Sequence, residues 1–364
     1  MVESSTRKDV PMSASLRFCT SSLWLFLVFT APSLAQSCTT ADDMDAGTRS
    51  AILATARRLF DFAARGDNAS LRQSSIPSLA ANFSGIESAI KDNQPVFSTA
   101  QASPRPPFLL KAEGTTPLER AEFLCGVFGA TGQTADSAVF VLNNLPPGTY
   151  AVSTLDLASA KGPFTLSFVL EQIGSDWKLG GFYTKASQVA GHDGSWYAER
   201  AREFKARNQP LNAWFYFLQA RDLMVPVPFM STRASDKLYD ESEAARPANL
   251  PTAGRPLDLV AQAPAPKSPT PKPGEHFNGT TSPASYQIID MFPSAVGNDF
   301  DLVVKYPVPD ISDTGKAFQE NMAVIKALVL QYPELHDSFT GIVARAVAPS
   351  GQDYGSLLAM KDIK

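Results

Sequence analysis

Residues 164–173 read FTLSFVLEQI, and after a short turn residues 177–184 read WKLGGFYT. In the first run apolar side chains alternate with mostly polar ones, which predicts a strand with one face on a core. Two further strand-like runs precede them, at 138–142 and 150–157, and turns rich in glycine or proline separate all four. Consecutive strands joined by tight turns predict an antiparallel meander.

Helical patterns come before these strands. Apolar residues recur at helical spacing over 45–66, a second helical region covers 70–90, and 107–111 read as a short strand. Residues 116–129 begin with TPLE, which combines a capping Thr, Pro at the first helical position and Glu at the third, and so predict another helix. The apolar face of this helix is expected to consist of Leu118, Ala121, Leu124, Cys125 and Phe128. We therefore expect an α+β domain over 45–187, with helices packed on an antiparallel meander sheet.

This order of elements resembles the nuclear-transport-factor-like cone fold of the cystatin-like group. The resemblance is carried by ARRLFDFAARGDNASL at 56–71 and by DWKLGGFYTK at 176–185, and it covers 45–187, about two-fifths of the chain. It implies a cone-shaped domain with a pocket, in which the common catalytic arrangement is a His paired with an Asp. The histidines of this chain all lie outside that range, at His192, His276 and His336.

A helical hairpin is expected at 192–228. Over 196–226 small and aromatic residues fall near the spacings of a single tetratricopeptide repeat, which this segment resembles. A solenoid needs about three such repeats, so we expect one hairpin packed on the sheet domain. A peptide-binding groove is the alternative interpretation.

Two further segments follow the hairpin. Large apolar side chains are few over 243–285, where proline is frequent, and we expect an extended, semi-rigid linker there. Residues 286–364 are expected to form a small ββαββ domain that folds alone. Its strands are predicted at 286–292, 300–306, 342–347 and 355–360. Its helix is expected to be capped by Asp313 and to carry an apolar stripe of Phe318, Met322, Ile325 and Val329.

The first residues have the features of an export signal. Arg17 supplies a cationic start, 23–29 read LWLFLVF, and a small-residue motif predicts cleavage after Ala35. We assign 1–35 to a signal peptide, with Met12 as an alternative start. The apolar run is about half of the ~20 residues that cross a bilayer, so we expect a secreted or periplasmic protein without a membrane span. The alternatives are an uncleaved anchor and a lipidated cysteine at position 38.

Two cysteines, Cys38 and Cys125, remain after the signal peptide, because Cys19 leaves with it. In an oxidising compartment an even pair favours a disulfide. We therefore expect a Cys38–Cys125 bond; the alternative is a buried Cys125 and an exposed thiol at Cys38.

Familiar enzyme signatures are absent from the sequence. It has no HExxH, GxSxG, phosphate-binding glycine loop or dinucleotide fingerprint, and we expect neither metal nor cofactor. The remaining candidates for a catalytic pocket are Asp156, Glu171 and Tyr183, with Trp177 on the same sheet. A desolvated carboxylate can act as a base, and Asp156 is the preferred one. The alternative is that Asp156 and Glu171 face solvent, and His192 is interpreted as a capping or surface residue.

Three functions from different classes stay open. We favour a secreted or periplasmic, non-enzymatic protein that binds a small apolar ligand or a protein partner. The second is an enzyme that uses a pocket carboxylate of the cone-like domain. The third is an envelope scaffold with two interaction domains on a proline-rich tether. The net charge of −4 disfavours nucleic-acid binding, and the missing signatures argue against an enzyme without deciding the question.

Overall fold

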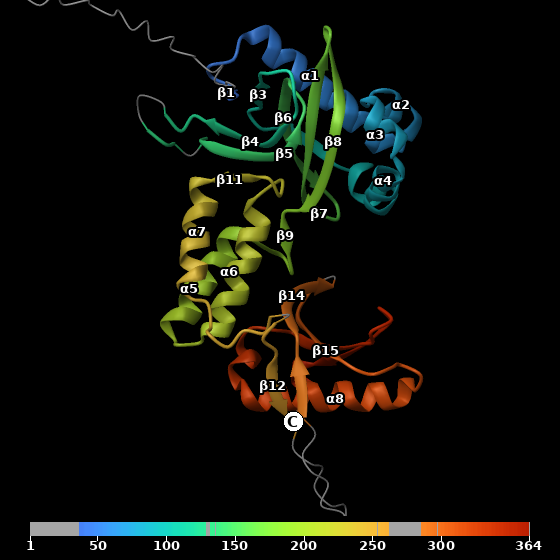
Figure 1. The fold of residues 1–364 in the computed structure, drawn as a ribbon, viewed down its shortest axis with the longest axis vertical. Helices are drawn as coiled ribbons and strands as arrows, with labels where there is room; N and C mark the ends of the chain where they lie inside the picture. Colours follow the sequence, from blue (N-terminus) through green and yellow to red (C-terminus); the bar gives the residue numbers. More distant parts are fainter. Residues whose placement is uncertain are drawn as a thin grey trace, which may run out of the picture. The chain divides into compact units, whose positions relative to one another are not determined.

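The computed structural model describes residues 36–128, 132–134, 136–252, 254–261, 285–296 and 298–363 (Figure 1). The predicted signal peptide and most of the proline-rich linker lie outside these residues. Within them, helices and mainly antiparallel sheets confirm the predicted α+β class.

The N-terminal part begins with one strand and four helices. They are β1 (Gln36–Thr39), α1 (Ala46–Arg65), α2 (Asn68–Gln73), α3 (Pro77–Ala81) and α4 (Ser84–Phe97). Asp45 caps α1, because its carboxylate accepts a hydrogen bond from the Thr48 amide at 2.8 Å. Gly66 ends the helix with φ at 67°, a conformation that glycine adopts without strain. The helices predicted over 45–66 and 70–90 are therefore confirmed.

The largest sheet follows these helices. Its strands are β2 (Gln101–Pro104), β3 (Phe108–Ala112), β6 (Gly148–Ser159), β7 (Gly162–Ile173) and β8 (Asp176–Ala186). The order is β1-β3-β6-β7-β8, with β2 also paired to β6, and every pair is antiparallel. Leu155, Leu166 and Phe168 pack from one face of this sheet on α1 and α4. The predicted meander is confirmed for β6, β7 and β8.

The helix predicted over 116–129 is wrong. Residues Leu118–Cys125 form strand β4, which pairs with β5 (Ala138–Leu145), and β5 pairs in turn with β11 (Met230–Thr232). Two members of the predicted helical face, Leu124 and Phe128, are exposed to 40% and 83%. Burial instead alternates along the strand, because cross-strand pairing with β5 outweighs the local capping motif.

This second sheet covers the face of the first that lies opposite the helices (Figure 1). Tyr150 and Val152 of β6 share a core with Phe123 of β4 and Phe140 of β5. A disulfide joins Cys38 of β1 to Cys125 of β4, with 5.0 Å between their Cα atoms, as predicted. Strand β5 thus belongs to a separate layer from the meander.

Three helices and two short strands come next. They are β9 (Gln188–Val189), β10 (His192–Asp193), α5 (Gly194–Ala206), α6 (Pro210–Met224) and α7 (Arg233–Glu243). Asp193 caps α5 by accepting from the Trp196 amide at 2.9 Å. The helical hairpin predicted over 196–226 is confirmed as α5 and α6.

The C-terminal elements follow the predicted ββαββ order. They are β14 (Asp290–Val296), β15 (Asp299–Pro307), α8 (Thr314–Gln331), the short helix η1 (Pro333–Asp337), β16 (Gly341–Val347), β17 (Asp353–Ala359) and η2 (Met360–Asp362). Asp313 caps α8 as predicted, with its carboxylate 2.9 Å from the Lys316 amide. The predicted stripe on α8 is only partly right: Ile325 and Val329 are buried, whereas Phe318 is 42% exposed.

Strand pairing also extends into the predicted linker. Residues Leu257–Val260 form β12, which pairs with β13 (Ser285–Ile288), and Leu259 is fully buried. The N-terminal boundary of the linker is therefore wrong. The small number of large apolar side chains in this region predicted no strand, but Leu257–Val260 form one.

The hairpin and the C-terminal sheet share one hydrophobic core. The ring centroids of Tyr216 on α6 and Phe300 on β15 are 5.3 Å apart, and the Tyr216 hydroxyl donates to the Ser338 carbonyl at 2.5 Å. Asn212 on α6 donates to the Glu334 carbonyl at 2.6 Å. The buried face of the hairpin thus lies on the C-terminal sheet, which differs from the expectation that it packs on the N-terminal one.

Candidate functional site

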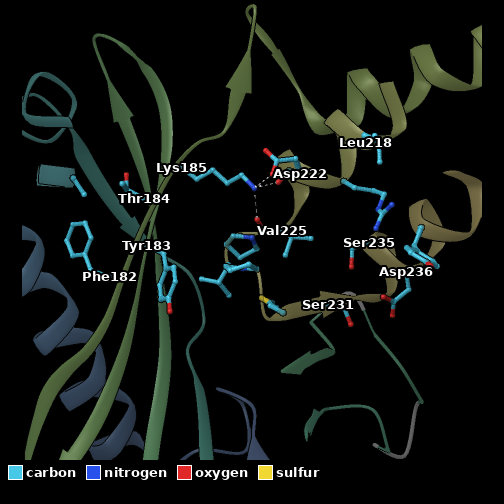
Figure 2. Close-up of a pocket in the computed structure, with 17 residues that line it drawn as sticks. Phe182, Tyr183, Thr184, Lys185, Leu218, Asp222, Val225, Ser231, Ser235 and Asp236 are labelled. Atoms are coloured by element: carbon cyan, nitrogen blue, oxygen red, sulfur yellow. Dashed lines mark hydrogen bonds and ion pairs between the residues drawn. The ribbon is translucent and has the colours of Figure 1, made fainter. Parts of the chain in front are cut away.

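A cleft of about 750 Å³ lies between strand β8, the end of α6, the segment 225–230 and the start of α7 (Figure 2). Apolar side chains predominate in its walls, among them Tyr183 from β8 and Met230 from β11. Its polar and charged lining residues come from β8, the end of α6, β11 and the start of α7. Because each wall comes from a different part of the chain, local sequence patterns do not indicate this site.

Lys185 fixes one end of the cleft. Its Nζ donates to the Asp222 carboxylate at 2.8 Å, to the Asp222 carbonyl, and to the Val225 carbonyl at 3.4 Å. Carbonyl groups at the end of a helix have no partner within the helix, so a lysine there satisfies them. Lys185 therefore joins the end of α6 to β8, and its three donors are occupied (Figure 2).

The segment that follows α6 forms an apolar wall. It reads VPVPF at 225–229, and its two prolines restrict the backbone. Val227 is buried in the core between the two sheets, and the Phe229 ring packs edge-on against Tyr183, with centroids 5.3 Å apart. Burial raises the pKa of the Tyr183 phenol, so this side chain is a neutral wall residue at neutral pH.

Helix α7 contributes the polar rim. Thr232 and Ser235 cap its first turn reciprocally, and Asp236 follows in the same turn. Among the residues that the structure describes, Asp236 has no ion-pair partner. Arg221 of α6 also borders the cleft, but its guanidinium lies 4.6 Å from the centre of the Tyr239 ring and donates to Ser242 at 3.2 Å.

The three candidates predicted from the sequence lie on one face of the main sheet. Strand register sets Asp156 opposite Thr165, and Glu171 opposite Tyr150. Asp156 and Glu171 are therefore six residues apart along the strands, about 20 Å. Only Tyr183 lines the cleft, so the structure does not bring the candidates together as a catalytic group.

Asp156 and Glu171 have different surroundings. The Arg105 guanidinium donates from Nε to Asp156 Oδ2 at 2.9 Å and from Nη2 to Oδ1 at 2.6 Å, and the Asp156 side chain is half exposed. Both oxygens of this carboxylate are thus engaged in a bidentate ion pair with Arg105. Burial raises the pKa of Glu171, and burial, with a smaller contribution from the charge of Glu171, raises the pKa of Tyr150 to about 12.

The remaining candidates lie elsewhere. Trp177 is buried in the core beneath the helices. His192 stacks on Trp196, with centroids 3.6 Å apart, immediately before the capping residue of α5. It borders a smaller pocket together with His336, whereas His276 lies outside the described residues.

Sequence reasoning missed Lys185, Asp222, Met230 and Asp236. The signal available was the Val-Pro-Val-Pro run after the helical hairpin, which marks a rigid extended segment but not its neighbours. Within the described ranges, no three side chains of His, Cys, Asp or Glu are grouped so as to hold a metal ion. No helix in these ranges has both the length and the apolar character needed to cross a membrane.

No family model matches this chain, and neither a curated protein nor a solved structure matches it significantly. The resemblances to a nuclear-transport-factor-like cone and to a tetratricopeptide-like hairpin therefore stay predictions. The interior between the sheet and its helices is packed with side chains such as Leu155, Leu166 and Phe168. The cleft beside Tyr183 is consequently the feature from which a function can be argued.

Proposed function

We propose that this protein is an exported, non-enzymatic binding protein, and that the cleft beside Tyr183 is its ligand site. The observation that carries the proposal is an open cleft of about 750 Å³ in which ten of the seventeen lining residues are apolar or aromatic. Sites for small ligands have volumes of about 300–1,000 Å³ and the same distribution of polarity. The ligand is an apolar small molecule or the apolar part of a protein partner.

Export is supported by two independent features. The run LWLFLVF at 23–29 and the small residues up to Ala35 have the pattern of a cleavable signal. The Cys38–Cys125 disulfide is compatible with an oxidising compartment, where such bonds persist.

An enzyme has less support than a binding protein. The preferred base, Asp156, is engaged by Arg105 and lies outside the cleft. The cleft itself contains Lys185 and Asp222 as a mutual ion pair, with no histidine or cysteine among its lining residues. Nucleophilic chemistry normally requires an activated Ser, Cys or Lys, and the Lys185 ammonium group is engaged by Asp222 and Val225.

Filling the cleft tests the proposal. The probe is the anionic dye 8-anilinonaphthalene-1-sulfonate, whose aromatic rings bind apolar surface, with fluorescence titration as the measurement. Ser231→Trp places a large side chain in the cleft and should weaken dye binding at least tenfold, because the apolar surface becomes inaccessible. Glu122→Trp is the matched control, since Glu122 is an exposed residue of the same three-stranded sheet away from the cleft.

The control variant should bind the dye as the wild-type protein does. Equal binding by Ser231→Trp and Glu122→Trp, or no saturable binding by the wild-type protein, would show that this cleft is not a binding site.

A further inference from the structure

Strand β8 is the last strand of the main sheet, and no strand of the described residues pairs with its outer edge. Near its start the edge is covered, because the Leu179 amide donates to the Ser74 carbonyl at 2.8 Å and the Ile76 amide donates to the Leu179 carbonyl at 2.9 Å. Beyond the bulge that follows Leu179, no described residue forms a backbone hydrogen bond with the outer side of 182–186. Open edges of this kind are usually covered or blocked in native proteins.

The hydrogen-bond pattern shows which residues face outward. The Ser187 amide donates to the Pro163 carbonyl at 3.0 Å, so these opposite residues form a hydrogen-bonded pair. Because such pairs alternate along antiparallel strands, Tyr183 bonds to β7. Phe182 and Thr184 therefore direct their amide and carbonyl groups away from the sheet.

A second contact gives the same result from the other side of β7. The Arg105 amide donates to the Thr154 carbonyl at 2.8 Å, so Thr154 directs its backbone away from β7. Ser167 lies opposite Thr154 and must therefore bond to β8, where its partner is Tyr183. The two contacts independently assign Thr184 to the open side.

The cleft runs along this edge. Four consecutive residues, 182–185, line it, although neighbouring side chains of a strand point to opposite faces. Figure 2 shows Lys185 projecting toward Asp222 of α6, with Phe182 and Thr184 on the other side of the strand. Because side chains from both faces of β8 line the cleft, the cleft lies beside the edge of the strand rather than over one face. The Thr184 hydroxyl oxygen in this region is buried without a hydrogen-bond partner among the described residues.

We infer that the cleft binds an extended polypeptide segment, which adds a strand to the open edge of β8. The inference rests on the proposed binding function and names the class of partner. Backbone groups of Phe182 and Thr184 would hold the segment, and its alternate apolar side chains would enter the cleft beside Tyr183 and Met230. At the α7 end of the cleft, Asp236, which has no ion pair among the described residues, would face a basic side chain of the segment, whereas Arg221 at the α6 end stacks on Tyr239.

The test uses an eight-residue synthetic peptide that alternates valine with lysine, and fluorescence anisotropy gives its dissociation constant. Thr184→Pro removes one outward amide and should weaken binding at least tenfold, whereas Glu122→Trp, on the other sheet and away from the cleft, should bind as the wild-type protein does. N-methylation of alternate peptide amides should cause a comparable loss without any change in the protein. Thermal unfolding shows whether each variant is folded.

The outcomes separate this inference from the proposed function. Peptide binding that is insensitive to both Thr184→Pro and N-methylation would overturn strand addition. Absence of peptide binding by a protein that still binds the dye in a Ser231-dependent manner would overturn it as well, and would leave the proposed function standing. A dimer in sedimentation that dissociates with Thr184→Pro would identify a second copy as the occupant and would contradict the inference.

Discussion

At the scale of single residues, Lys185 connects two walls of the cleft, strand β8 and the end of helix α6. Its ammonium group satisfies the carboxylate and carbonyl of Asp222 and the carbonyl of Val225, and so positions the wall that these residues begin. The contact joins positions 37 residues apart, which no local pattern can indicate. Tyr183, in contrast, was a pocket candidate because it lies on a predicted strand, but its face could not be predicted, since the bulge after Leu179 turns Tyr183 to the face opposite the helices.

Lys185→Met should release the end of α6 while preserving the apolar stem. The lysine side chain is 28% exposed, so partial solvent screening limits the expected loss to about 1 kcal/mol in the free energy of unfolding. Urea denaturation measures this loss. Lys178→Met is the control on the same strand, and the role assigned to Lys185 is wrong if both variants lose the same stability.

At the scale of elements, the sequence predicts those helices and strands whose own apolar periodicity determines their conformation. Helix α1, the strands β6–β8 and the capped helix α8 have complete patterns of their own, and each forms where it is expected. Strand β4 does not, because its TPLE start favours a helix locally and only pairing with β5 makes it a strand. The candidate site depends on such nonlocal pairing. Of its lining residues, only Tyr183 was a candidate from the sequence.

The disulfide belongs to this scale, because it joins two strands that do not pair with each other. Cys38 and Cys125 are separated by 87 residues, and a loop of this length gives a stabilisation of about 4 kcal/mol on the chain-entropy account. The double substitution of both cysteines by serine should lower the free energy of unfolding by about that amount. Reduction of the disulfide in the wild-type protein should give the same loss, and the same reducing conditions should leave the serine variant unchanged. A loss of stability on substitution but not on reduction, or the reverse, would contradict this account.

At the scale of the whole molecule, the arrangement of cores differs from the one expected. The hairpin shares aromatic residues with the C-terminal sheet, including Tyr216 and Phe300, so the two do not have separate interiors. Amphipathic patterns show that a helix has a buried face, but they do not identify its partner. The same limit explains why the cleft, which lies between β8 and the helices α6 and α7, emerges only from the structure.

The central claim is that the cleft beside β8 binds through the open edge of that strand. Amide hydrogen exchange, followed residue by residue by NMR, tests it most directly. In the free protein the amides of Phe182 and Thr184 should exchange rapidly, and those of Tyr183 and Lys185 should be protected by β7. Addition of the valine–lysine peptide should slow exchange at Phe182 and Thr184 at least tenfold. Unchanged exchange at both amides in the presence of saturating peptide would contradict the account.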